Sequence, residues 1–220
     1  MKKIYLVDIE GSNIANVKYA LQNYFEVITI KNPKMLDDES PNIVLPGNGS
    51  FGYYISFLQN NGWLTILEGI INRKFSGKLF CICSGFQALG VMSDESEGIK
   101  GPGFIDYSFR SLEKFFKSYL IINIGRKEIM QSENCLTLKD LGFSNDLINK
   151  KVNKPYFVHG YGAQFNSNNL RNTNKYCYLY TEVNKKKLLA GLISKNFCAT
   201  QFHPELSGSA WREFMINFFK

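Results

Sequence analysis

A cysteine stands at the end of an apolar run in the stretch LFCICSGFQALG, residues 79–90. Cys83 is followed at once by Ser84 and Gly85, after which apolar residues recur at helical spacing. A sharp strand-to-helix turn of this kind lifts a nucleophile to the edge of a sheet, and small residues permit the turn. The helix N-terminus favours the thiolate through its dipole and its free N–H groups. The pattern therefore predicts an activated thiol at Cys83, although a small buried side chain is the commoner role of a cysteine.

Histidine is the base that suits a thiol nucleophile at neutral pH, and the chain has two histidines, His159 and His203. His203 lies in QFHPEL, where an apolar strand ends and a proline prevents a helix from following. In extended backbone, residues two apart point the same way, so we expect Glu205 to orient the imidazole of His203. His159 has no carboxylate near it in PYFVHGYG and is predicted to be structural. Cys83, His203 and Glu205 together predict a nucleophile, a base and its orienting carboxylate.

A cysteine that attacks a carbonyl also needs donors for the oxyanion that forms. The backbone N–H of Ser84, the residue after the nucleophile, is one candidate, and the glycine-rich loop PGNG at residues 46–49 supplies others. Glycines let the backbone approach closely without a clash from Cβ. A glycine-rich turn before a helix also binds phosphate, but neither G-x-x-x-x-G-K-[ST] nor G-x-G-x-x-G spacing is present. We therefore rank phosphate binding lower.

The elements that must position these residues alternate between strand and helix. Apolar, β-branched runs predict strands at 4–7, 26–30, 42–45 and 78–82, and helical spacing predicts helices at 14–24, 55–71 and 86–91. This order predicts an α/β fold with a mostly parallel sheet and helices on both faces. Right-handed crossovers then place all strand-to-helix turns on one edge of the sheet. The PGNG loop and Cys83 are therefore expected on the same rim.

The second half of the chain has shorter strands separated by polar turns. Strands are predicted at 156–161, 176–181, 188–194 and 197–202, which indicates hairpins added to the sheet. An amphipathic helix is predicted at 210–219, with its apolar stripe in the core. The mixed pattern of residues 101–154 assigns no element, and no linker divides the 220 residues into separate domains.

Composition excludes several classes of protein. With 45% hydrophobic and 15% aromatic residues, the chain is globular rather than disordered. No apolar run is long enough to span a membrane and the first residues do not form a signal-peptide core, so we expect a cytoplasmic protein without a membrane partner. Five cysteines form no disulfide framework, and the lone C-x-C of Cys81 and Cys83 is a weak zinc pattern. We therefore expect no metal and no cofactor.

The net charge of +7 does not indicate a nucleic-acid partner. Lysines are scattered through polar loops such as EVNKKKLL, without the interleaved aromatic residues that nucleic-acid modules carry. A solvated basic surface, or a docking face for an acidic partner, accounts for the charge.

With the three predicted catalytic residues in place, the sequence resembles class I (triad) glutamine amidotransferases, most of all the glutaminase subunits of imidazole glycerol phosphate synthases. The matching segments occur in the family's order over most of the chain. They are VDIEGSNIANVKYAL, IVLPGNGSFG, CICSGFQALG, ESEGIKGPGFI, PYFVHGY and QFHPELSG. Cys81 stands where the family commonly has glycine, which leaves a second thiol near Cys83.

The resemblance implies a flavodoxin-like α/β fold in a single domain, residues 1–220, that hydrolyses L-glutamine to glutamate and ammonia. It implies that Cys83 attacks the side-chain amide and forms a glutamyl thioester, while His203, held by Glu205, carries the protons. The residues implied to hold glutamine or its oxyanion are Gly47, Asn48, Gly49, Ser84, Gln87, Gly160 and Tyr161.

The resemblance also implies a heterodimer with a (β/α)-barrel cyclase subunit. That partner would receive the ammonia through a tunnel and make imidazole glycerol phosphate in histidine biosynthesis. Three alternatives stay open at this point. The chain could supply ammonia for amidation of a nucleotide-linked sugar in surface polysaccharide synthesis, serve as a non-catalytic binding or regulatory subunit, or act alone as a cysteine hydrolase on γ-glutamyl substrates.

Overall fold

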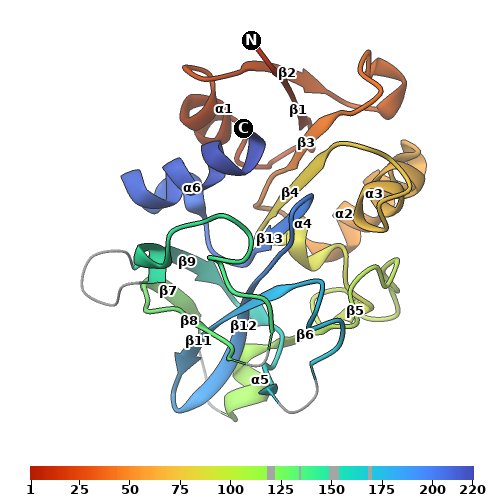
Figure 1. Ribbon diagram of the computed structural model, residues 1–220. Helices are drawn as coiled ribbons and strands as arrows, with labels where there is room; N and C mark the ends of the chain where they lie inside the picture. The colour runs from red at the N-terminus through yellow and green to blue at the C-terminus, as the bar shows by residue number, and fades with distance from the viewer. Residues whose placement is uncertain (118–121, 134, 149–153, 168–169) are drawn as a thin grey trace.

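An eight-stranded sheet forms the centre of the molecule in the computed structural model (Figure 1), which describes residues 1–117, 122–133, 135–148, 154–167 and 170–220. The strand order is β2-β1-β3-β4-β13-β12-β11-β8. In that order the strands are Glu26–Ile30, Lys3–Val7, Asn42–Leu45, Lys78–Ile82, Phe197–Thr200, Lys186–Ile193, Cys177–Val183 and Met130–Gln131.

The first five strands in this order are parallel, and the other three are antiparallel. Four of the five are the strands that the sequence predicts for a parallel sheet, whereas β13 was expected among the hairpin strands. The α/β fold class with a mostly parallel sheet and added hairpins is confirmed. The antiparallel strands continue the sheet beyond its parallel part, beginning at β13, which pairs with both β4 and β12. Continuous apolar strands such as β3, whose Ile43, Val44 and Leu45 are fully buried, fit a sheet that is covered on both faces.

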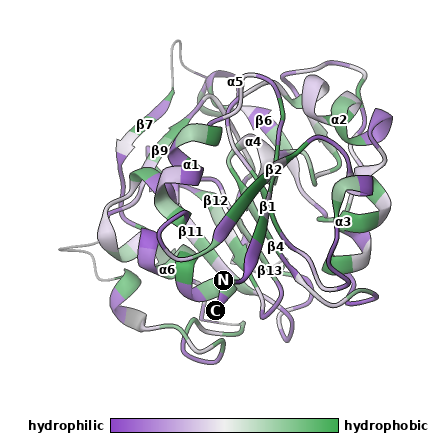
Figure 2. Ribbon diagram, turned by 90° about the horizontal axis from the view of Figure 1, so that it is seen from above, coloured by the Kyte–Doolittle hydropathy of each residue, from purple (hydrophilic) through white to green (hydrophobic). Residues whose placement is uncertain are grey.

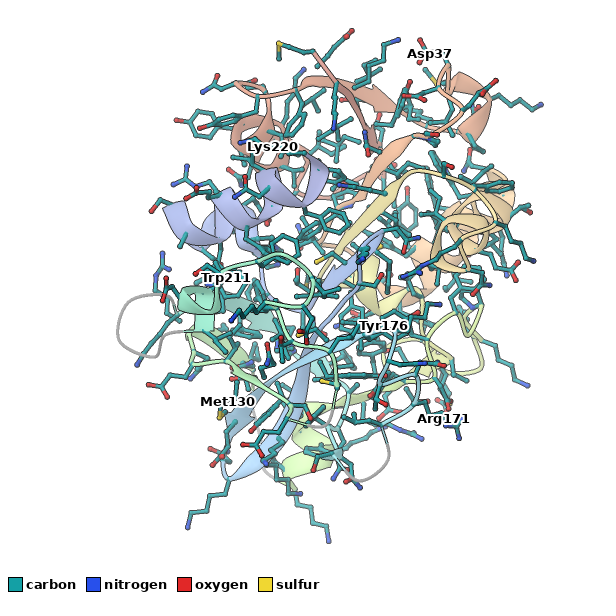
Figure 3. All side chains as sticks on the ribbon, in the orientation of Figure 1. Asp37, Met130, Arg171, Tyr176, Trp211 and Lys220 are labelled. Atoms are coloured by element: carbon teal, nitrogen blue, oxygen red, sulfur yellow. The ribbon has the colours of Figure 1, made fainter. Side chains whose placement is uncertain are left out.

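Helices cover both faces of the sheet (Figure 2). α1 (Ile14–Leu21) and α6 (Ser209–Phe219) pack on one face, and α2 (Phe51–Asn60) and α3 (Trp63–Ile71) pack on the other. The apolar stripe of α6 lies in the core as predicted. Trp211, labelled in Figure 3, lies on the first turn of α6 with its ring centroid 4.7 Å from that of Phe202.

Three of the predicted helices have different bounds. α1 ends at Leu21, so Tyr24 lies outside it and is exposed. The helical stretch predicted at 55–71 is two helices, because Gly62 takes a left-handed backbone (φ 78°) between α2 and α3. The helix predicted at 86–91 is instead the short α4, Ser84–Gln87. It ends before Gly90, where the backbone lies so close to the carbonyl oxygen of Tyr107 that a Cβ would be 2.6 Å from it.

Two small sheets lie beside the main sheet. One joins β5 (Met92–Ser93), β6 (Ser108–Ser111) and β10 (Tyr161–Gly162). The other is a ribbon of β7 (Asn123–Arg126) and β9 (Tyr156–His159). The single strand predicted at 156–161 is therefore split between two sheets. Gly160 lies between the two strands, and its carbonyl accepts the Leu112 N–H at 2.9 Å.

The remaining elements are short helical turns. α5 (Leu112–Phe116) follows β6, and 3₁₀ turns occupy Pro33–Met35, Asn145–Ile148 and Pro204–Leu206, the last labelled η4. In the ranges that the structure describes, no helix has the length and apolar character needed to cross a membrane.

Candidate active site

Cys83 forms the turn between β4 and α4. Its backbone has φ 48° and ψ −108°, a region that L-residues other than glycine rarely adopt. Hydrogen bonds hold the turn, because the Cys83 N–H donates to the Thr200 carbonyl at 2.7 Å and the Cys83 carbonyl accepts from the Gln87 N–H at 2.9 Å. A Cβ at Gly85 would lie 2.6 Å from the Leu45 carbonyl oxygen, so only glycine fits there. The sharp strand-to-helix turn expected from the sequence is present.

His203 and Glu205 form a buried ion-pair contact beside this turn. The His203 Nδ1–H donates to Glu205 Oε1 at 2.7 Å, and Asn13 Nδ2 donates to the same oxygen at 2.8 Å. The prediction that Glu205 contacts His203 holds, but the extended backbone assumed for it is wrong. Residues Pro204–Leu206 form the 3₁₀ turn η4, and His203 is its N-cap residue. The turn folds the carboxylate back onto the ring.

The other side of the His203 ring faces Cys83. Burial alone lowers the pKa of His203, but the neighbouring Cys83 sulfur and the Glu205 carboxylate raise it well above its ordinary value. Within the described residues, His203 Nε2 has no hydrogen-bond partner. A buried ring nitrogen that has no hydrogen-bond partner and lies next to a thiol is placed to exchange a proton with that thiol or with a bound substrate.

The PGNG loop packs against both Cys83 and His203. A Cβ at Gly47 would lie 2.9 Å from Cys83 Cβ and 2.9 Å from His203 Cε1. Asn48 and Gly49 have left-handed backbones, with φ 76° and 113°. Ser84 Oγ donates to the Gly49 carbonyl at 2.8 Å, which ties the loop to α4. The first N–H groups of a helix have no partner within it, so the Ser84 N–H is left without an acceptor inside α4.

A cavity of about 430 Å³ opens above the thiol. Of the site residues predicted from the sequence, the structure brings eight to its wall: Asn48, Gly49, Cys83, Ser84, Gln87, Gly160, Tyr161 and His203. Gly47 and Glu205 lie behind the wall, against His203. Gln87 Nε2 donates to the Tyr161 carbonyl at 3.1 Å, which connects α4 to β10 across the cavity. The volume suits a ligand of amino-acid size.

Glu95 and Asn13 are among the residues at the site that were not predicted from the sequence. Glu95 supplies the carboxylate of the cavity wall, where its Oε2 accepts the Phe51 N–H at 2.6 Å and burial raises its pKa. Asn13, which bonds Glu205, also donates its N–H to the Gly47 carbonyl at 2.9 Å. No local sequence pattern indicates either role, because each residue is far in sequence from the groups that it contacts and reaches them only in the folded chain.

His159 also reaches the cavity wall, in a structural setting. Its Nδ1 lies 2.8 Å from the Tyr161 carbonyl oxygen and its Nε2 lies 2.9 Å from Asn123 Nδ2. Burial lowers its pKa to about 4, so the ring is neutral at pH 7. The geometry agrees with the structural role expected for His159.

Cys81 lies away from the cavity. It is fully buried in the core cluster under α2 and α3, whereas Cys83 belongs to the cluster on the other face. Burial raises the pKa of the Cys81 thiol well above its ordinary value, which keeps it protonated and inert. Within the described ranges, no group of three or more His, Cys, Asp or Glu residues is arranged to hold a metal ion.

Comparison with known proteins identifies the class of protein to which the chain belongs. The family model for "Glutamine amidotransferase class-I" matches residues 5–220, and the chain belongs to this family. The "Imidazole glycerol phosphate synthase subunit HisH" of Prochlorococcus marinus subsp. pastoris is 32% identical over 222 residues, covering 100% of this chain and 98% of the relative.

Two other matches extend this comparison. The "Imidazole glycerol phosphate synthase hisHF" of Emericella nidulans is 30% identical over 96% of this chain, and the chain spans 36% of the length of that protein. Among solved structures, PurLQS from Thermotoga maritima superposes with a TM-score of 0.65 at 21% identity, covering 100% of this chain and 99% of the other. The structural match supports the fold alone.

Proposed function

We propose that the chain hydrolyses L-glutamine with Cys83 as nucleophile. The Cys83 sulfur attacks the side-chain amide carbon, and His203 gives its proton to the leaving nitrogen, so that ammonia departs and a glutamyl thioester remains. Water then attacks the thioester, with His203 accepting its proton, and glutamate is released as the thiol is restored. The observation that carries this proposal is the buried contact of His203 with Glu205 beside the strained turn at Cys83.

We assign glutamine binding to groups on the cavity wall. Glu95 offers a half-buried carboxylate to the α-ammonium group of the substrate. The N–H groups of Ser84 and of the PGNG loop are the donors that we assign to the oxyanion. Gln87 and the backbone at Gly160 and Tyr161 form the rest of the wall and would orient the amide.

The ammonia acceptor that we propose is the cyclase subunit of an imidazole glycerol phosphate synthase, a (β/α)-barrel in histidine biosynthesis. The names and near-complete coverage of the HisH relatives support this assignment. The fungal hisHF relative, which matches this chain over 36% of its length, supports it further, because its name joins both subunits in one protein. The chain would then act as the glutaminase half of a heterodimer.

Release of glutamate from glutamine tests the nucleophile. We expect the Cys83→Ala variant to lose all turnover, because no other described thiol faces the cavity. The Cys81→Ala variant is the matched control, since it removes a thiol two residues away that is buried in the opposite core. Turnover that persists in Cys83→Ala, or that disappears only in Cys81→Ala, would refute the assignment.

A second experiment tests the acceptor. The chain is co-expressed with the cyclase subunit encoded in the same genome, in a histidine auxotroph that lacks its own glutaminase subunit. We expect growth without histidine, and none when the Cys83→Ala variant replaces the wild type. Glutamate release that requires a nucleotide-sugar synthase instead would reject the cyclase while keeping the glutaminase mechanism.

A further inference from the structure

The guanidinium of Arg126, at the end of β7, reaches the backbone of the turn that carries Glu205. Its Nη1 donates to the Ser207 carbonyl at 3.1 Å and its Nη2 to the Leu206 carbonyl at 3.4 Å. Nη1 also donates to the Lys154 carbonyl at 3.1 Å, on the segment that leads into β9. One side chain therefore bridges the β7–β9 ribbon and the end of η4.

Two of these carbonyls, those of Leu206 and Ser207, lie where a short helical turn ends. η4 ends at Leu206, and the last carbonyls of a helical turn accept no hydrogen bond within it. A cation at this end is also favoured by the dipole of the turn. After Ser207 the chain bends at Gly208, which has φ 90°. The helical turn η4 therefore does not continue into the next residues.

Both ends of the turn are also held by β9. The His203 N–H donates to the Tyr156 carbonyl at 2.9 Å, and the Tyr156 N–H donates to Ser207 Oγ at 2.8 Å. Glu205 sits between these two attachments and has one oxygen, Oε2, without a hydrogen-bond partner in the described residues. Besides the hydrogen bond from Asn13, its position against His203 depends on how the backbone on either side is fixed.

We propose that Arg126 is a positioning residue for the catalytic carboxylate, fixing the end of η4 so that Glu205 stays against His203. The role depends on geometry as well as charge, because a planar guanidinium donates to several carbonyls at once and an ammonium does not. The inference deepens the proposed glutaminase function and rests on it, since it assigns Arg126 to the same site.

Steady-state glutamate release distinguishes positioning from binding. The substrate-facing groups Glu95, Gln87 and Tyr161 lie on other elements, so Arg126→Ala should leave KM for glutamine within about 2-fold and lower kcat about 10- to 100-fold, the loss expected from a displacement near 1 Å. Arg126→Lys keeps the charge but loses the planar guanidinium, so it should recover only part of kcat. Equal kcat in wild type, Arg126→Ala and Arg126→Lys would overturn the proposal.

Arg212→Ala is the matched control for these variants. The Arg212 Nε donates to the carbonyl of Gly208, the residue after the stretch that Arg126 holds and outside the bounds of η4. We expect its kcat to equal that of the wild type. A loss in Arg212→Ala as large as that in Arg126→Ala would show a general sensitivity of this segment and would overturn the specific role.

Imidazole NMR titration gives a readout that does not need turnover. The chain has only two histidines, and the charged or titratable groups that face His203 are Cys83, Glu205 and His159. We expect the titration midpoint of His203 to fall by about one pH unit in Arg126→Ala, because the carboxylate moves away from the ring. The His159 midpoint should stay in place. An unchanged His203 midpoint in a folded variant would refute the role of Arg126 even if the chain hydrolyses no glutamine.

Discussion

Adding one methyl group at Gly47 should disturb the catalytic pair without removing any functional group. In a Gly47→Ala variant the new carbon would lie 2.9 Å from Cys83 Cβ, 2.9 Å from His203 Cε1 and 3.1 Å from the Ile82 carbonyl oxygen. Carbon atoms pack at about 3.5 to 4.0 Å, so the thiol and the ring must each retreat by about 0.6 Å or more. The added methyl group therefore displaces the nucleophile and the base at the same time.

A displacement of this size near reacting atoms lowers kcat by about 10- to 100-fold. The overpacking should also cost about 1 to 3 kcal/mol of unfolding free energy. Initial rates of glutamate release at saturating glutamine measure the first effect, and urea unfolding followed by circular dichroism measures the second.

Gly191→Ala separates the two effects. Its added Cβ would lie 3.0 Å from the Ala199 carbonyl oxygen, between β12 and β13, and it touches neither Cys83 nor His203. We expect a comparable loss of stability and an unchanged kcat. If Gly47→Ala retained full kcat, or if Gly191→Ala lost as much kcat, the placement of Gly47 between nucleophile and base would be wrong.

Three other predictions concern charge. Glu205→Gln keeps an acceptor for His203 but removes the negative charge that raises its pKa, so the alkaline limb of the kcat–pH profile should move to lower pH; an unmoved limb contradicts this. Glu95→Gln should raise KM for glutamine about 10-fold with kcat retained, since only the ammonium contact is weakened; an unchanged KM would remove Glu95 from the binding site. His159 has a pKa of about 4 when folded and 6.5 as its ordinary value, so the unfolded chain takes up the proton first as pH falls. Acidification from pH 7 to 5 should therefore destabilise the wild type by about 2 kcal/mol more than His159→Gln, measured by urea unfolding at both pH values, and parallel losses would contradict the buried neutral ring.

The local sequence was sufficient for the parallel strands because each is an apolar run bounded by turn residues. The local sequence did not predict the positions where a helix is interrupted or an extended stretch becomes a turn. Gly62 interrupts a continuous apolar pattern by adopting a left-handed conformation, and periodicity contains no information about that choice. The stretch after His203 looked extended because proline excludes an α-helix, but proline also starts a 3₁₀ turn, and the buried contact with Glu205 selects that turn.

The candidate site shows the same division. Cys83, His203 and Glu205 were predictable because turn chemistry and side-chain type restrict what each can do. Asn13 was not, since its hydrogen bond to Glu205 joins residues 192 positions apart in the chain. The sequence placed Cys81 and Cys83 two residues apart without indicating that the strained turn at Cys83 would separate them into opposite core clusters.

By itself, the sequence determined the alternation of strands and helices, the rim on which PGNG and Cys83 meet, and the residue types available for thiol chemistry. These follow from short-range preferences: apolar periodicity, glycine at turns and the handedness of crossovers. Only the tertiary structure decided which groups touch. Glu95 lines the cavity, Cys81 lies outside it, and Arg126 bonds the turn that carries Glu205. Packing brings these segments together, and their spacing in the sequence does not predict the contacts.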